Sequence, residues 1–123
     1  MIKILLFSIT FLFPLINADL KLNLDNELDL LMPKVIEWRH DIHEHPELSN
    51  REFRTAKKIE DHLRSLGIEI ETKIAYTGIV GMIEGGLPGP TMALRADMDA
   101  LPVEEKTGLP FASKVRTTYL GND

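Results

Sequence analysis

The sequence contains no cysteine, few aromatic residues and no run of basic residues. Without cysteine, neither a disulfide framework nor a cysteine-ligated zinc site can form within these 123 residues. The formal net charge is -5, and aromatic residues make up 7% of the chain. Nucleic-acid binding depends on basic groups that neutralise phosphates and, for single strands, on aromatic stacking. The composition therefore argues against a nucleic-acid partner and indicates an ordinary globular domain, or part of one.

The N-terminal segment has the composition of a secretory signal. Lys3 supplies a positive charge, residues 4–16 are almost wholly apolar, and Ala18 precedes the first acidic residue, Asp19. This order is typical of an export signal, and the apolar part is too short for a helix that crosses a bilayer. A buried N-terminal helix or strand is the alternative. We predict a signal peptide over residues 1–18 and an exported protein, periplasmic or secreted, without a stable membrane anchor.

Two amphipathic helices are expected next. In the first, over 27–43, apolar residues recur every three or four positions; a start at Pro33, which would then stand in the first turn, is the alternative. Pro46 ends the pattern, because a residue before proline avoids the helical region. The second helix should run from about residue 51 to residue 66, with Gly67 as a left-handed residue at its end.

The second helix also carries a start signal and an apolar stripe. Ser49 and Glu52 have the S-x-x-E spacing of a capping box. The residues expected to be buried lie at helical spacing, namely Phe53, Ala56, Ile59, Leu63 and Leu66.

The period of the pattern then changes to that of β-strands. Alternation over 68–74 predicts a half-exposed edge strand, and the apolar run 78–84 predicts a strand covered on both faces. A turn rich in glycine and proline leads to a third strand over 91–97. We therefore predict an α/β fold in which two helices precede a sheet, with the second and third strands forming a hairpin. The sheet as given is incomplete, since its inner strand needs cover on both faces.

Residues 94–102 are the most informative stretch, because an apolar run leads into Asp97 and Asp99. In a strand these two carboxylates share a face, and open α/β sheets bind ligands at such strand ends. Like charges this close need a cation or hydrogen-bond donors. One interpretation is a metal site, or a carboxylate that orients a metal ligand. The other is a pair of turn carboxylates that cap loop amides before Pro102.

Two further clusters of polar residues have simple explanations. His40, His43 and His45 gather near the end of the first helix, but only the first two have the spacing of one helix face. A polar helix end accounts for them, since histidine suits the helix dipole there. We interpret Glu104 and Glu105 as a solvated loop pair.

Together these stretches resemble the aminoacylase/carboxypeptidase-type metal-dependent amidohydrolases, in the branch that includes hippurate hydrolases and auxin-conjugate hydrolases. Four ordered motifs carry the resemblance: 39–49 with Glu52, 77–81, 94–105 and 108–111. It implies a hydrolase that cleaves N-acyl amino acids, small-molecule substrates, with a water activated by two divalent metal ions, zinc or manganese. It also implies a homodimer or larger assembly for the full-length enzyme.

The same resemblance suggests roles for the two aspartates. Asp99 corresponds to the catalytic-site aspartate that orients a metal ligand. Asp97 lines the site, at a position where peptidase relatives have a histidine ligand. No direct metal ligand is assigned, because the family's ligand segments would follow Asp123. We therefore expect residues 19–123 to be the N-terminal part of a catalytic domain, inactive alone. A small exported non-enzymatic module that binds a cation through Asp97, Asp99 and nearby histidines is the alternative.

Overall fold

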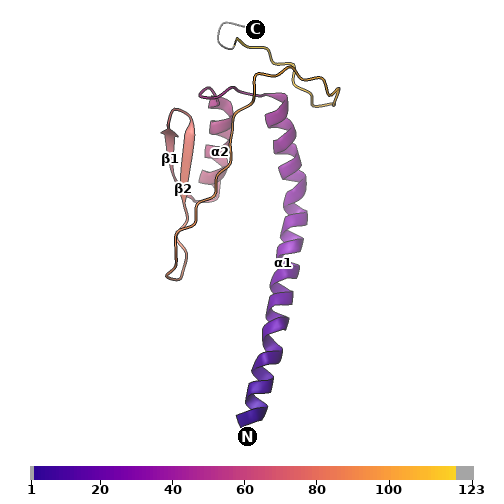
Figure 1. Cartoon of the computed structure of the whole chain (residues 1–123), viewed down its shortest axis with the longest axis vertical. Helices are drawn as coiled ribbons and strands as arrows, with labels where there is room; N and C mark the ends of the chain where they lie inside the picture. The colour runs from indigo at the N-terminus through magenta and orange to yellow at the C-terminus, as the bar shows by residue number, and fades with distance from the viewer. Residues whose placement is uncertain (1, 119–123) are drawn as a thin grey trace. The chain divides into compact units, whose positions relative to one another are not determined.

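The computed structural model describes the backbone of residues 2–118 and the side chains of residues 21–118. Its elements are α1 (Ile2–Glu44), α2 (Phe53–Ser65), β1 (Glu69–Ile74) and β2 (Gly78–Met82) (Figure 1). The chain divides into a helical unit, Met1–His40, and an α/β unit, Asp41–Asp123. The predicted α/β class is confirmed: two helices precede a small antiparallel sheet.

Helix α1 is longer than predicted. It runs from Ile2 to Glu44 and passes through Pro33, so the predicted start near residue 27 or at Pro33 is wrong. Proline removes one backbone donor from a helix, yet the turns on both sides retain theirs, and α1 continues. The predicted end is confirmed, since the His45 N–H donates to the Asp41 carbonyl at 3.2 Å just before Pro46.

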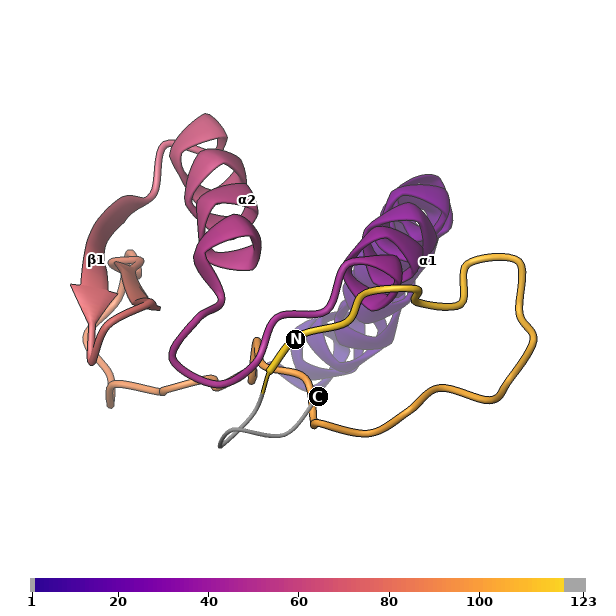
Figure 2. The same ribbon diagram turned by 90° about the horizontal axis from the view of Figure 1, so that it is seen from above.

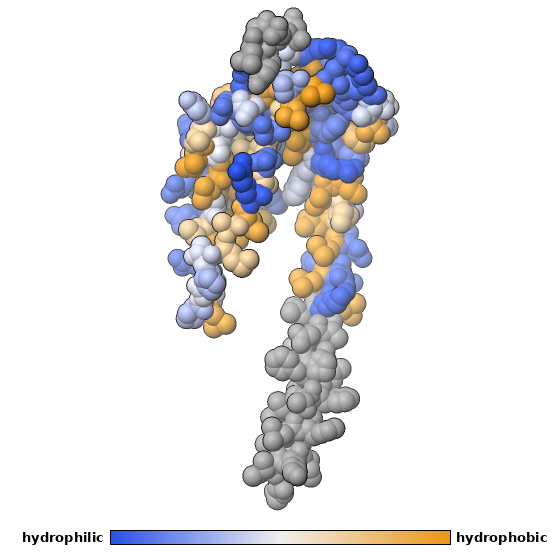
Figure 3. All heavy atoms as spheres, viewed as in Figure 1, coloured by the Kyte–Doolittle hydropathy of each residue, from blue (hydrophilic) through white to orange (hydrophobic). Residues whose placement is uncertain are grey.

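The described side chains of the helical unit include many exposed apolar groups, among them Leu30 at 76% exposure (Figure 3). Within the part of the chain that the structure describes, no helical stretch combines the length and the apolar character needed to span a bilayer. The predicted signal sequence over 1–18 lies outside the residues whose side chains are described. Cleavage after Ala18 therefore stays a prediction.

In the α/β unit, α2 packs alongside a hairpin formed by β1 and β2 (Figures 1 and 2). Glu69 pairs with Met82 at one end and Ile74 with Gly78 at the other, with a bulge between Thr72 and Ile74. The predicted hairpin between the second and third strands is therefore wrong. The first and second strands form it instead, because their connection is the shorter one.

The hairpin turn is tight and uses residues that rarely adopt its conformation. Ala75 and Tyr76 have φ of 48° and 87°, in the left-handed region that residues other than glycine rarely adopt. Thr77 follows the turn and is buried, and its hydroxyl donates to the Glu52 carboxylate at 2.5 Å. This hydrogen bond ties the tip of the hairpin to the start of α2.

The predicted third strand is wrong. Residues 91–97 are not a strand, and all of them are exposed, with Leu94 at 95%. A strand requires a hydrogen-bonded neighbour, and residues 91–97 form no ladder with either β1 or β2. Elsewhere in the described part of the chain, no other strand is available beside this segment.

The predicted burial of α2 is correct only in part. Phe53 and Leu66 are 66% and 60% exposed, whereas the three other residues of the predicted stripe are half-buried. Within the described residues, Leu48 is the only apolar residue classed as buried. The remaining buried residues are polar, namely Glu52, Thr55 and Thr77. Glu52 and Thr77 are hydrogen-bonded to each other, whereas the buried hydroxyl of Thr55 has no partner among the described residues.

Helix α2 ends as the sequence predicts. Gly67 has a φ of 73°, and its N–H donates to the Arg64 carbonyl at 2.9 Å. The Ile68 N–H donates to the Leu63 carbonyl at 3.1 Å, which completes a Schellman motif.

Gly67→Ala should destabilise this end of α2 by about 1–2 kcal/mol, because a side chain disfavours positive φ. The space around Gly67 is open, so the effect is conformational and not steric. Gly85→Ala is the matched control, since Gly85 is equally open and no positive φ is recorded there. Hydrogen exchange of the Ile68 amide measures the effect. Equal protection in both variants would contradict the prediction.

Candidate functional site

The segment that carries Asp97 and Asp99 contacts the loop that follows α1. Leu48 and Ala100 form a parallel bridge, and the Ala100 N–H donates to the Glu47 carbonyl at 2.8 Å. Leu48 is buried at this contact, with 8% of its surface exposed. Two motifs that are distant in sequence are therefore held together by main-chain hydrogen bonding.

Glu47 also organises the start of α2 through its side chain. One carboxylate oxygen accepts the Arg54 N–H at 2.9 Å, and the other accepts the Thr55 N–H at 2.7 Å. A carboxylate is favourable there, because the first amides of a helix have no partner within the helix and carry partial positive charge. The predicted capping box of Ser49 and Glu52 is therefore wrong, and Glu47 provides the cap.

Glu52 is instead part of the buried contact with the hairpin. Burial disfavours its charge, but hydrogen bonds from the Thr77 hydroxyl and from backbone amides outweigh this cost and lower the pKa of the carboxyl. The Asn50 N–H is one of these donors, at 3.0 Å.

Asp41 forms an ion-pair cluster at the end of α1. Its carboxylate contacts the Lys58 ammonium and, at 2.5 Å, the Arg54 guanidinium, both from α2. The hydrogen bonds from Lys58 and then from Arg54 lower the pKa of Asp41 from 3.8 to about 2. The carboxylate is therefore ionised at any ordinary pH and fixes the end of α1 against α2.

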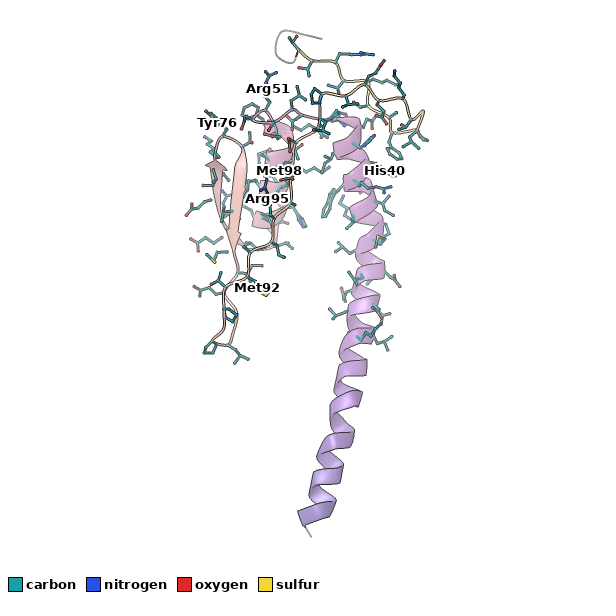
Figure 4. The ribbon with its side chains drawn as sticks, in the orientation of Figure 1. His40, Arg51, Tyr76, Met92, Arg95 and Met98 are labelled. Atoms are coloured by element: carbon teal, nitrogen blue, oxygen red, sulfur yellow. The ribbon has the colours of Figure 1, made fainter. Side chains whose placement is uncertain are left out.

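Asp97 and Asp99 do not form the shared strand face that the sequence predicted. Asp97 pairs with Arg95 at 2.8 Å and is 69% exposed, and Asp99 is also exposed. Figure 4 shows Arg95 and Met98 on this segment, which leads from the hairpin to Ala100. The backbone next to Asp99 is thus held in place, while its carboxylate stays accessible.

The described residues do not assemble a metal site. Among them, no group of three or more histidine, cysteine or acidic side chains could hold a metal ion. His45 contacts the Asp41 carbonyl at 2.9 Å, and His43 contacts Glu105 at 2.9 Å. The structure therefore does not bring Asp97, Asp99 and the histidines together as the cation-binding alternative requires. Two bound metal ions would need ligands beyond those that the structure describes.

Glu105 makes structural contacts that the sequence interpretation missed. Its carboxylate accepts the Thr107 hydroxyl at 2.5 Å, the Ser113 N–H at 2.6 Å and His43 Nε2 at 2.9 Å. The Thr107 hydroxyl, then His43 and the Ser113 amide, lower the pKa of Glu105 to about 2. The ring of Phe111 meets His43 edge-on, with ring centres 5.6 Å apart.

The interpretation of a solvated loop pair is therefore correct for Glu104 and wrong for Glu105. The Glu104 side chain is 56% exposed and pairs with Lys106 and Arg116, whereas that of Glu105 is only 15% exposed. The hydroxyl two residues after Glu105 was the available signal, since such a residue can donate back to a carboxylate.

Comparison with known proteins gives consistent relatives, although no family model matches the chain. The chain is 50% identical over 99 residues to Thermostable carboxypeptidase 1 of Saccharolobus solfataricus. This match covers 80% of the chain and 25% of the carboxypeptidase. The chain is 43% identical over 93 residues to the hippurate hydrolase of Campylobacter jejuni, covering 76% and 24% respectively.

A solved structure agrees with these sequences. The fold matches that of a dinuclear metal-binding peptidase from Bacillus subtilis with a TM-score of 0.64 and 48% identity, over 71% of this chain and 24% of the other. The relatives define a class, the metal-dependent amidohydrolases and peptidases. The solved relative is a member of the M20 family, so the homologues of this chain are M20-family amidohydrolases and peptidases, in agreement with the resemblance seen in the sequence. The chain spans about a quarter of the length of these relatives.

Glu47→Ala should destabilise the first turn of α2 by about 1 kcal/mol, since the loss of a capping side chain typically costs this much. Hydrogen exchange of the Arg54 and Thr55 amides measures the loss of protection. Glu44→Ala is the control, because Glu44 is an exposed acid at the end of α1. If the Arg54 and Thr55 amides are equally protected in Glu47→Ala and Glu44→Ala, the capping role of Glu47 is wrong.

Lys58→Gln should raise the pKa of Asp41 from about 2 toward 3.8, because Lys58 supplies the largest stabilisation of the carboxylate. The ion pairs of Asp41 stabilise the fold above its unperturbed pKa and are lost as the pH falls through about 2. Carboxyl carbon shifts of Asp41 report the titration. Lys57→Gln is the control, because Lys57 pairs with Asp61 instead. An unchanged midpoint in Lys58→Gln would contradict the assignment.

Proposed function

We propose that this chain is part of an amidohydrolase that hydrolyses N-acyl amino acids with two divalent metal ions, zinc or manganese. The observation that carries the proposal is the main-chain contact between Glu47 and Ala100, which joins two of the family's motifs. The similarity to a hippurate hydrolase supports the substrate class, since hippurate is an N-acyl amino acid. The dinuclear metal site of the solved relative supports the number of metal ions.

Within this activity, Asp99 would orient a metal ligand contributed from outside the described residues, and Asp97 would line the site. The position of Asp99 supports this role, because its neighbour Ala100 is held by a hydrogen bond while Asp99 itself is exposed. A carboxylate that orients a metal-ligating histidine accepts the second ring N–H of that histidine, so its oxygens must be accessible. We further propose that residues 19–123 alone are inactive.

Export and assembly are also proposals. The charged, apolar and small residues of positions 1–18 support secretion with cleavage after Ala18. N-terminal sequencing of protein from an extracytoplasmic fraction should begin at Asp19. The resemblance to the amidohydrolase family is the support for a homodimer or larger assembly of the full-length enzyme.

The activity can be tested in a chimera in which this chain replaces the homologous quarter of the hippurate hydrolase. We expect hydrolysis of hippurate in the presence of zinc or manganese. Asp99→Asn should lower the rate about 10- to 100-fold, as removal of groups that orient metal ligands commonly does. Glu69→Gln, on the exposed face of β1, is the control. A chimera that binds metal but does not hydrolyse hippurate would contradict the proposed activity. An Asp99→Asn variant that is as fast as the unsubstituted chimera would contradict the proposed role of Asp99.

Experiments on the 123-residue chain alone distinguish part of an amidohydrolase from a cation-binding module, the two alternatives that the sequence left open. We expect no metal-dependent hydrolysis of hippurate and only weak binding of zinc or manganese in calorimetric titrations. Tight stoichiometric binding would favour the cation-binding module. Measurable hydrolysis would refute the proposed inactivity of the isolated chain.

A further inference from the structure

We infer that Glu105 and His43 are positioning residues that hold the loop of residues 103–113 against the end of α1 and so fix the backbone beside Asp99. We call this contact the His43–Glu105 clasp. It concerns the order of the described chain itself and does not depend on the proposed hydrolysis.

The clasp is unusual because one carboxylate gathers donors from three places. These are the ring of His43 on α1, the hydroxyl of Thr107 and the backbone N–H of Ser113. A surface glutamate on a loop normally gains little from any single contact, because water competes for it. Glu105 has three partners and a side chain that is only 15% exposed, so the carboxylate closes the loop onto itself and onto the helix.

The aromatic contact adds direction to the hydrogen bond. Phe111 meets the ring of His43 at an interplanar angle of 82°. Such edge-on contacts are favourable and fix the orientation of both rings. Because Phe111 lies within the same loop, the loop contacts His43 both through Glu105 and through an apolar side chain. The orientation of His43 directs Nε2 toward Glu105, and an ionised carboxylate requires that this nitrogen carries the proton.

The clasp lies close in sequence to Asp99. Ala100 is held to Glu47, and Glu105 is held to His43, so that only residues 101–104 connect two fixed points. This connection is stiffened by Pro102, whose φ is restricted, and by a hydrogen bond from the Val103 N–H to the Leu101 carbonyl at 2.8 Å. Asp99 therefore precedes a short segment that is tied at both ends.

The neighbouring charged groups are engaged in other contacts. Glu104 pairs with Lys106 and Arg116, and Asp41 pairs with residues of α2. Glu44, the next residue on α1, is exposed. Glu105 is consequently the acidic partner of His43 in the structure, and its adjacent residue Glu104 offers a matched control.

The first test follows the amide proton of Ser113 by NMR in the full 123-residue chain. Because this amide donates to Glu105, its chemical shift should titrate with that carboxyl, with a midpoint far below that of an ordinary glutamate. Glu105→Gln should abolish the titration, and Glu104→Gln should leave it unchanged. If the shift of the Ser113 amide keeps the same low midpoint in Glu105→Gln, Glu105 is not the acceptor of this amide.

The second test measures hydrogen exchange of the Ala100 amide, which reports whether the clasp reaches the segment beside Asp99. Loss of a hydrogen bond to a charged group should speed exchange about tenfold in Glu105→Gln. His43→Phe, which keeps a ring for Phe111 but has no donor, should have the same effect, and His43→Gln should partly restore protection. Glu104→Gln should resemble the natural chain.

The exchange rates in Glu105→Gln and His43→Phe can refute the positioning role. If Ala100 stays protected in both Glu105→Gln and His43→Phe, the clasp orders only its own loop and the positioning role is wrong. The Ala56 amide of α2 controls for unfolding, since it bonds to the Glu52 carbonyl at 2.8 Å. If Glu105→Gln also speeds exchange of the Ala56 amide, that variant has lost α2 and cannot test the role. The comparison of the Ala100 and Ala56 amides in His43→Phe then provides the test. If both variants lose protection at Ala56 as well as at Ala100, the contact stabilises the whole unit, and a role confined to the segment beside Asp99 is wrong.

Discussion

The α/β unit depends on the hydrogen bonds of one residue, Glu47. Its carboxylate caps α2, and its carbonyl accepts the amide of Ala100. Side chain and main chain of the same residue therefore connect the helix, the loop after α1 and the segment that carries Asp99. A change in the position of Glu47 alters both contacts at once, because both start from the same short piece of backbone.

Carboxylates perform in this unit the structural work that apolar side chains perform in larger cores. Glu52 holds the hairpin, Asp41 holds the end of α1 against α2, and Glu105 holds the loop after residue 103. Each has several donors, and the pKa of each is lowered as a result. Leu48 is the only buried apolar residue among those described, so burial alone gives little stability here. Strong acid should for this reason loosen the unit at several points together.

The sequence predicted well those features that depend on local backbone chemistry. Pro46 ends α1 and Gly67 ends α2, because each restricts or permits particular dihedral angles regardless of distant contacts. It failed at the start of α1, which passes through Pro33, at the choice of hairpin, and where the outcome depends on a partner elsewhere in the chain. The strand expected over 91–97 has no neighbour among the described residues, and the cap of α2 comes from Glu47, outside the S-x-x-E pattern.

The candidate site shows the same division between local and distant information. The spacing of Asp97 and Asp99 predicted a shared face at the end of a strand, and the structure shows no paired strand over 91–97. Without such pairing, Asp97 pairs with Arg95, and the backbone beside Asp99 is held by the hydrogen bond between the Ala100 N–H and the Glu47 carbonyl. The two aspartates are therefore not equivalent, although the motif presents them as a pair. An accessible carboxylate on a fixed backbone suits a group that must orient something else, and Asp99 meets this condition while Asp97 does not.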